Sequence, residues 1–294
     1  MIRLLKKLAD VAKLVRPVGW APFLFSLTLG AADSGASPSW RLLAAFLVCG
    51  PLCLGSGYVI NFYFDRQIDK LNPIRKDLDM SSQPFSTGEI GLIGGMSLAL
   101  TLLLLGLALA WLISSEFFTL ALSSWLVGLL YSAPPIRLKA RPFLDVLSNS
   151  VSCGYLCYTA GWTIGRNLSE MPLLLPVWLS VFVAPTYILT LLIDNEADSL
   201  AGVRTTVAYL GIPRSLRLGH VLLCTSYLML AAAQVIVGIR FLHLVLLSVF
   251  YPLGVLGYRK LLTRFTLEGA RKLGKRAVQS SVLFICLALF HFLA

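Results

Sequence analysis

Long apolar stretches alternate with short polar connections along almost the whole chain. A helix needs about 20 apolar residues to cross the hydrocarbon core of a bilayer. Nine stretches reach or approach that length: Val18–Ala32, Leu42–Phe64, Ile90–Ile113, Phe117–Ser132, Phe143–Ile164, Met171–Ile193, Leu218–Ile239, Phe241–Gly257 and Val278–Ala294. The pattern predicts an all-α, polytopic membrane protein with nine transmembrane helices in one domain over residues 18–294.

The first 17 residues show a different pattern, in which basic and apolar side chains follow each other at helical spacing. The basic side chains are Arg3, Lys6, Lys7, Lys13 and Arg16, and the apolar ones among them are Leu4, Leu8, Val11 and Val15. This pattern predicts an amphipathic helix over residues 1–17 that lies on the membrane surface.

The composition indicates lipid, rather than water, as the surroundings of most side chains. Hydrophobic residues make up 57% of the chain, charged residues only 13%, and the mean hydropathy is +0.80. Soluble domains usually contain about 25% charged residues. The net charge of +11 does not indicate a nucleic-acid partner, because the basic residues lie in short loops between apolar stretches.

The basic residues also orient the predicted helices. With nine spans, all but three of the 25 Lys and Arg fall on the side that holds the N-terminus, the exceptions being Arg41, Arg166 and Arg240. Cytoplasmic loops of membrane proteins carry an excess of Lys and Arg. We therefore expect the N-terminus and the basic loops in the cytoplasm.

Two acidic motifs stand where predicted spans end. Asn61, Asp65 and Asp69 are four residues apart at the end of the second span, so they share one helix face. Asp194 and Asp198 share a face at the end of the sixth span. Four spans separate the motifs, so both emerge on the cytoplasmic side. Their offset of 133 residues predicts a parallel repeat of two four-helix units plus one helix.

The chemistry of these motifs points to a metal ion. Carboxylates at a membrane boundary are unfavourable, and like charges four residues apart on a helix repel each other. Mg²⁺ binds carboxylate oxygens and completes its shell with water and substrate phosphate. We expect the two motifs to face each other and to hold Mg²⁺ that bridges a diphosphate. Solvated helix ends, or a relay for protons or cations, are the alternatives.

Basic side chains accompany the acidic motifs on the same side. They are Arg75 and Lys76 after the first motif, Arg137, Lys139 and Arg141 in the loop between spans four and five, and Arg204 after the second motif. Such side chains bind phosphate oxygens and stabilise a leaving group. Each can also be explained by the topological excess of cytoplasmic charge. Arg137, Lys139 and Arg204 are the stronger candidates because they lie close to the motifs.

The chain resembles the UbiA superfamily of intramembrane prenyltransferases. The resemblance rests on the two acidic motifs, on Arg16-Pro17 before span one, and on the Tyr131-Ser-Ala-Pro-Pro-Ile-Arg-Leu-Lys139 loop. It implies a helical barrel that opens laterally to lipid and binds a prenyl diphosphate through Mg²⁺. It further implies metal or diphosphate ligands at Asn61, Asp65, Asp69, Asp194 and Asp198, and diphosphate contacts at Arg16, Lys76, Arg137, Lys139 and Arg204.

Two positions depart from the usual family pattern. Phe62 stands where the family often has an Asp after the motif Asn, and Gln83-Pro84 stands where it often has Arg-Pro. One phosphate contact is then expected to be absent, or its role to pass to Arg75 or Lys76.

The predicted activity is transfer of a prenyl group to a lipophilic acceptor within the membrane lipid, with release of diphosphate. Aromatic faces can stabilise an allylic carbocation, and the candidates are Phe62, Phe64, Tyr131, Tyr158, Trp162 and Tyr187. Asp145 and Asn149 are candidates to contact the acceptor or its proton, with helix capping as the alternative. A terpene cyclase on the same scaffold and a membrane transporter are the competing functions.

Overall fold

The computed structural model describes residues 2–71, 84–238 and 240–293, and over these residues it contains helices and no strand. The predicted all-α class is confirmed. The N-terminal half is made of α1 (Ile2–Val15), η1 (Pro17–Trp20), α2 (Ala21–Asp33), α3 (Trp40–Leu47), η2 (Val48–Leu52), α4 (Cys53–Leu71), α6 (Pro84–Thr87), α7 (Leu92–Ile113) and α8 (Ser115–Ser132).

The C-terminal half begins after a loop that contains a short 3₁₀ turn, η3 (Leu138–Ala140). It consists of α9 (Leu144–Ser150), η4 (Val151–Leu156), α10 (Cys157–Trp162), η5 (Leu168–Glu170), α11 (Leu174–Leu200), α12 (Thr206–Leu210), α13 (Ile212–Val237), α14 (Phe241–Val245), η6 (Leu246–Phe250), α15 (Tyr251–Thr263) and α16 (Leu267–Leu293). The segments η2, η4 and η6 are π-helical turns inside longer helices.

Seven helical stretches of the described residues are long and apolar enough to cross a membrane: Ala9–Asp33, Trp40–Gln67, Leu92–Ile113, Leu174–Leu200, Ile212–Ile236, Phe241–Thr263 and Leu267–Phe290. The predicted count of nine is therefore not confirmed. The other two predicted spans correspond to α8 and to the broken helix α9–η4–α10. Both contain several serines, which lower their hydropathy, and the first turn of α8 contains the acidic Glu116.

The start of the chain, where a division at residue 17 is predicted, forms a nearly continuous helical path. The first stretch of spanning length begins at Ala9, because α1 continues through η1 into α2. Arg16, which has a left-handed backbone with φ of 50°, and Pro17 mark the join. Leu14 is fully buried in a cluster with Val59 and Ile60 of α4. A position of α1 on the membrane surface stays a prediction.

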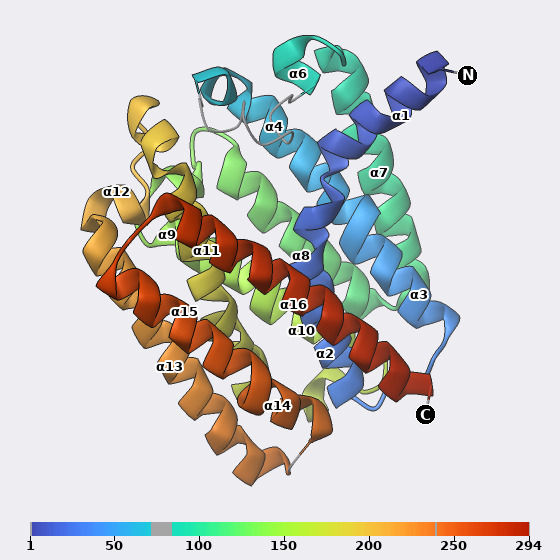
Figure 1. The fold of residues 1–294 in the computed structure, drawn as a ribbon. Coiled ribbons are helices and arrows are strands. Elements are labelled where there is room, and N and C mark those ends of the chain that lie inside the picture. The colour runs from blue at the N-terminus through green and yellow to red at the C-terminus, as the bar shows by residue number, and fades with distance from the viewer. Residues whose placement is uncertain (1, 72–83, 239, 294) are drawn as a thin grey trace.

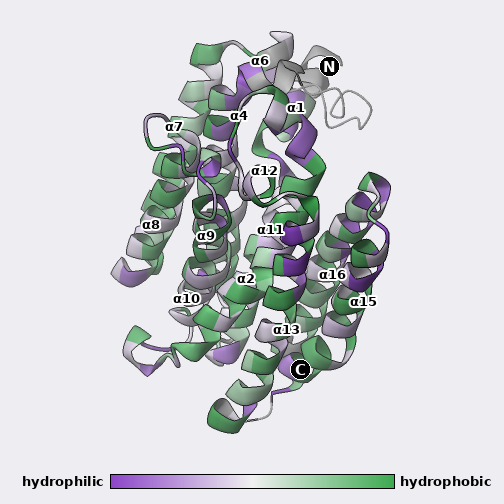
Figure 2. Ribbon diagram, turned by 90° about the vertical axis from the view of Figure 1, so that its left-hand side faces the viewer, coloured by the Kyte–Doolittle hydropathy of each residue, from purple (hydrophilic) through white to green (hydrophobic). Residues whose placement is uncertain are grey.

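The long helices run side by side, and the two ends of the molecule differ (Figure 1). The C-terminal ends of α4 and α11 lie at the end that also holds the N-terminus. The turn from α13 to α14 and the C-terminus lie at the opposite end. Hydrophobic residues cover the middle of the long helices, and hydrophilic residues gather at the end near α1 and α4 (Figure 2).

Small residues allow the closest helix contact in the core. A Cβ atom at Gly30 of α2 would lie 2.0 Å from the Tyr158 carbonyl oxygen, and one at Gly161 of α10 would lie 2.0 Å from the Leu27 carbonyl oxygen. Such small residues let backbones pack closely inside membranes, where association relies on contact rather than on the hydrophobic effect. The contact places α2 directly against α10.

A buried charged cluster holds the C-terminal end of α2 in place. Asp33 accepts hydrogen bonds from Tyr158 (Oη to Oδ2, 2.8 Å), His243 (Nε2 to Oδ2, 2.9 Å) and Arg240 (Nη1 to Oδ1, 3.0 Å). Asp33 is 3% exposed and His243 is completely buried. The cluster joins α2, α10 and α14.

Candidate active site

Asp65 is the acidic residue that the structure surrounds most clearly with positive charge. It lies near the C-terminal end of α4, and its side chain is 13% exposed. Its Oδ1 accepts a hydrogen bond from Lys139 Nζ and lies 3.6 Å from Arg137 Nη2. The loop between α8 and α9 thus reaches back over the end of α4, in agreement with the prediction that these segments lie on the same side of the membrane.

Arg137 combines a strained backbone with an unsatisfied side chain. Its φ of 42° is in the left-handed region, which is unfavourable for residues other than glycine. Its Nε and Nη2 atoms are buried and have no hydrogen-bond partner. Buried guanidinium nitrogens normally have acceptors, and phosphate oxygens are good ones. These two donors therefore fit an anionic ligand next to Asp65.

Two tyrosines meet below this loop. The hydroxyls of Tyr131 in α8 and Tyr187 in α11 form a hydrogen bond, and their rings are 6.3 Å apart at 74°. This bond joins α8 to α11, and α11 also packs against α4, so the helices of both acidic motifs lie side by side, although they are far apart in the sequence.

Asn61 lies one helical turn before Asp65 on the same face of α4. Its Nδ2 donates a hydrogen bond of 3.0 Å to Ser132 Oγ at the end of α8. That bond orients the amide so that its oxygen remains an acceptor or a metal ligand. Ser132 is 1% exposed, and only its place next to Tyr131 could have drawn attention to it in the sequence.

The second motif forms the last two turns of α11, where Asp194 and Asp198 are half-buried. The Asp198 carbonyl accepts a hydrogen bond of 2.8 Å from Val203 N, and Gly202 takes a φ of 69°. This turn ends the helix, and Arg204 follows it with its side chain exposed.

Arg16 reaches the same helix from α1. Its guanidinium carbon lies 5.6 Å from the centre of the Tyr58 ring of α4. Tyr58 is seven residues before Asp65, which is two turns, or about 10 Å, along the same helix face. Arg16 is therefore placed at the edge of the site rather than against Asp65.

Asp145 and Asn149 lie on α9. Asp145 is completely buried and accepts hydrogen bonds from Val146 N (2.8 Å) and from both the backbone nitrogen (2.6 Å) and the hydroxyl of Thr206. Asn149 is half-buried one turn later. Thr206 carries no signal in the sequence, because 61 residues separate it from the acid that it binds.

Some predicted residues fall outside this geometry. Lys76 lies outside the described residues, and so does the side chain of Asp69. Tyr158 and Trp162 were candidates to face a carbocation, but their polar atoms bond to Asp33 and to the Asn167 carbonyl at the other end of the bundle. Phe62 packs in a buried cluster with Leu14 and Phe85, among others.

The donors at the site fit a magnesium ion. Among the His, Cys, Asp and Glu side chains that the structure describes, no three lie close enough together to hold a metal ion by themselves. The carboxylate of Asp65 and the amide oxygen of Asn61 nevertheless share one face of α4, and α11, which carries Asp194 and Asp198, packs against α4. This all-oxygen set suits Mg²⁺, which takes few protein ligands and fills its shell with water and phosphate.

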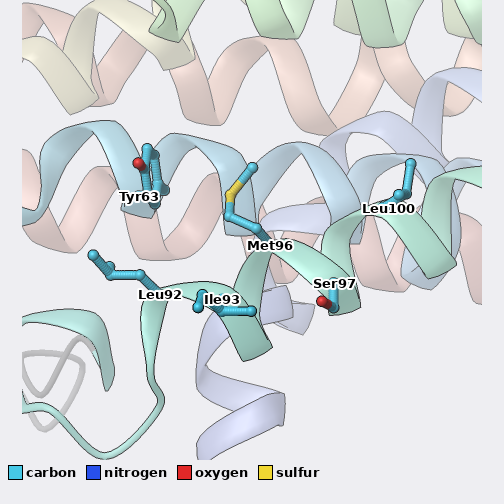
Figure 3. Close-up of a pocket in the computed structure, with 6 residues that line it drawn as sticks. All are labelled: Tyr63, Leu92, Ile93, Met96, Ser97 and Leu100. Atoms are coloured by element: carbon cyan, nitrogen blue, oxygen red, sulfur yellow. The ribbon is translucent and has the colours of Figure 1, made fainter.

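An apolar hollow of about 480 Å³ lies on the outer side of α4 and α7. It is lined by Tyr63, Leu92, Ile93, Met96, Ser97 and Leu100 (Figure 3). Tyr63 precedes Asp65 by two residues, so the two side chains point to nearly opposite sides of α4. The hollow is therefore separate from the acidic site.

Known proteins match this chain over most of its length. Residues 20–290 match the UbiA prenyltransferase family. The chain is 31% identical over 261 residues to the lycopene elongase/hydratase of Halobacterium salinarum. The alignment covers 84% of this chain and 86% of that protein. It is 29% identical over 234 residues to the digeranylgeranylglyceryl phosphate synthase of Saccharolobus solfataricus. That alignment covers 79% of this chain and 77% of the relative. A UbiA homolog from Archaeoglobus fulgidus, solved bound to GPP and Mg²⁺, has a TM-score of 0.78 and 26% identity, and covers 97% of this chain and 100% of that one.

Proposed function

The chain belongs to the UbiA prenyltransferase family, and from this premise we propose that it is a Mg²⁺-dependent intramembrane enzyme that transfers a prenyl group from its diphosphate to a lipophilic acceptor. The family resemblance seen in the sequence motifs is thereby confirmed. The chain is an integral, multi-pass membrane protein by its family and its apolar helices. We place its N-terminus and the active-site loops in the cytoplasm.

The observation that carries the proposal is the contact between Asp65 and the loop that holds Lys139 and Arg137. Two guanidinium nitrogens of Arg137 are buried without acceptors beside a carboxylate that suits Mg²⁺. A diphosphate satisfies both groups at once, because its oxygens accept from the guanidinium and coordinate the metal. Neither a neutral substrate nor a bare cation does so.

The residues that would hold Mg²⁺ are Asn61, Asp65, Asp69, Asp194 and Asp198. When bound, the metal neutralises charge on the diphosphate and makes it a better leaving group. Arg137, Lys139 and Arg204 stabilise the same charge as it develops. Arg16, at the edge of the site, is an additional candidate for diphosphate contact, and Lys76 stays a candidate from its place in the sequence.

The reaction breaks the bond between C1 of the prenyl chain and the diphosphate oxygen, and the electron pair leaves with diphosphate. The allylic cation left behind is stabilised by aromatic faces, for which the hydrogen-bonded residues Tyr131 and Tyr187 are our candidates. A nucleophilic atom of the acceptor then bonds to C1, and the acceptor loses a proton. Burial among helices keeps water from competing for the cation.

The names of two relatives, a lycopene elongase/hydratase and a digeranylgeranylglyceryl phosphate synthase, support a lipophilic acceptor. Asn149, half-buried on α9, is our candidate for contact with it. An acceptor of this kind reaches the site from the surrounding lipid.

The test is diphosphate release from prenyl diphosphates of C10 to C20 chain length by the purified full-length protein in detergent. It is run with Mg²⁺ and with EDTA, and with membrane lipid extract as the source of acceptor. Asp65→Ala and Asp198→Ala are compared with Glu116→Ala, which removes an exposed acid from the start of α8.

We expect release that requires Mg²⁺, falls at least about 100-fold in both site variants and is unchanged in Glu116→Ala. Dependence on the extract shows transfer to an acceptor, whereas release without it shows cyclisation of the prenyl chain where the product is a cyclic hydrocarbon rather than the prenyl alcohol formed with water. Folded wild-type protein that releases no diphosphate from any substrate contradicts the proposal.

A further inference from the structure

The buried pair Asp145–Thr206 connects two segments that the proposed function assigns to diphosphate binding. Asp145 Oδ2 accepts a hydrogen bond of 2.6 Å from Thr206 N, and Oδ1 accepts another from Thr206 Oγ1. Both residues are completely buried. A carboxylate buried to this extent is strongly unfavourable unless it is hydrogen-bonded, so the three donors of Thr206 and Val146 hold it firmly in place.

The pair lies directly next to the cationic loops. Asp145 is six residues after Lys139 and belongs to the first turn of α9. Thr206 is two residues after Arg204 and is the first residue of α12. Each partner is therefore only a few residues along the chain from a cation that the proposed diphosphate site uses.

Phe143 links the Arg137–Lys139 loop to Thr206. Its φ of 68° is in the left-handed region, which is unfavourable for an aromatic residue. Its backbone nitrogen donates a hydrogen bond of 2.7 Å to Thr206 Oγ1, and its ring packs edge-on against Tyr209 of α12 at 5.8 Å. Strained backbone persists only where the surroundings hold it, and here α12 supplies the contacts that hold it.

We infer that Asp145 and Thr206 are positioning residues, which lock the Arg137–Lys139 loop to the turn that carries Arg204 so that both sets of cations meet one diphosphate. This inference rests on the proposed function. It gives Asp145 a role through Thr206 and the loops rather than by contact with the acceptor. The Thr206 hydroxyl is the central atom, because it donates to Asp145 and accepts from Phe143.

A positioning role of Asp145 and Thr206 differs from a purely structural role in its effect on the KM for the prenyl diphosphate. A structural defect lowers the amount of folded enzyme and its melting temperature, while the KM of the folded fraction stays the same. Loss of positioning raises the KM for the prenyl diphosphate and loosens the Arg137–Lys139 loop, in which no residue has been changed.

The experiment compares Thr206→Val, which removes the hydroxyl at nearly constant volume, with Thr206→Ser, which keeps it. Thr28→Val is the matched control, since Thr28 is also completely buried but bonds only within α2, to the Leu24 carbonyl at 2.6 Å. Diphosphate release from geranyl diphosphate gives kcat and KM. Amide hydrogen exchange is followed over residues 133–143, and the melting temperature is measured for each variant.

We expect Thr206→Val to raise KM at least about tenfold and to speed exchange over residues 133–143, because small misplacements of binding groups have large effects on rate. Thr206→Ser and Thr28→Val should stay within about threefold of wild type. Tyr209→Ala removes only the ring contact from an exposed position, and should raise KM in the same direction even if Thr206→Val does not fold.

An unchanged KM in folded Thr206→Val, or in Tyr209→Ala where Thr206→Val does not fold, overturns the inference. So does a rise in KM that Thr28→Val shares. Wild-type protein without diphosphate release is a different result, because it contradicts the proposed function itself. In that case unchanged hydrogen exchange over residues 133–143 in Tyr209→Ala still decides against the coupling of the two segments.

Discussion

Single residues at the site combine positive charge with a geometry that only a tertiary fold can impose. Lys139 pairs with Asp65, while two buried nitrogens of Arg137 have no hydrogen-bond acceptor, and one of these, Nη2, forms the ion pair with Asp65 at 3.6 Å. A guanidinium presents several donors in a fixed plane, whereas an ammonium is a compact charge. Arg137 is therefore suited to hold a diphosphate by its shape as well as by its charge.

Arg137→Lys keeps the positive charge but loses the planar donors. We expect KM for the prenyl diphosphate to rise about tenfold or more, since a hydrogen bond to a charged group contributes about 1.5–3 kcal/mol. Steady-state diphosphate release measures the change. Arg141→Lys, in the same loop but exposed, is the control and should leave KM within about twofold. Equal effects of the two substitutions contradict the role given to Arg137.

At the scale of elements, the two ends of the bundle use charge in different ways. At the Asp65 end, the guanidinium of Arg137 keeps two donors that a ligand can use. At the other end, Arg240 and Arg166 are used within the fold: Arg240 pairs with Asp33, and Arg166 Nε donates to the Ser34 carbonyl at 3.2 Å. Two of the three basic residues that break the topological charge bias thus cap the C-terminus of α2, where positive charge is favourable.

The hydrogen bonds of this cluster also define which ring nitrogen of His243 is the donor. Gln234 Oε1 accepts from Arg240 N at 3.2 Å, so its amide nitrogen faces His243 Nδ1 at 2.8 Å. Nδ1 then accepts, and Nε2 carries the hydrogen that His243 donates to Asp33. The one negative charge of Asp33 is balanced by Arg240. A balanced cluster is what a buried ion pair needs.

Asp33→Asn removes the negative charge and leaves Arg240 without its counter-ion. We expect a loss of about 3 kcal/mol in the free energy of unfolding, because breaking one partner of a buried pair costs about 3–5 kcal/mol and Arg240 is partly exposed. Unfolding by SDS in mixed micelles measures it. Glu116→Gln, an exposed acid, should change stability by less than about 0.5 kcal/mol. A stability of Asp33→Asn equal to that of this control contradicts the role of the cluster.

At the scale of the whole molecule, the N- and C-termini lie at opposite ends of the bundle (Figure 1). An odd number of membrane crossings produces this arrangement, and both seven and nine are odd. The basic loops lie with the N-terminus, so the charge bias and the tertiary arrangement agree on which segments share a side.

Reporter fusions test this topology. We expect green fluorescent protein at the N-terminus to fluoresce, and alkaline phosphatase at the C-terminus to be active, because the first folds in the cytoplasm and the second only outside it. The positive-inside rule gives the orientation. Alkaline phosphatase placed in the loop between α8 and α9 is the internal control and should be inactive. Termini on the same side of the membrane contradict the arrangement.

The sequence alone determined the class of fold and the chemistry of the site. Apolar length specifies a membrane helix without reference to other segments, and spacing of four residues puts Asp65 on the face of Asn61. These properties are local, so they can be read along the chain. The predicted number of nine spans is not confirmed, because polar residues lower the hydropathy of α8 and of the broken helix α9–η4–α10.

The tertiary structure decided which residues meet. Lys139 reaches Asp65 across 74 residues, Thr206 reaches Asp145 across 61, and Tyr158 turns away from the site to Asp33 across 125. Nothing in the local pattern distinguishes Tyr158 from Tyr187, since both are tyrosines in apolar helices. Their roles differ because helix packing carries one hydroxyl to each end of the bundle, where a buried polar group must find the partner that lies within reach.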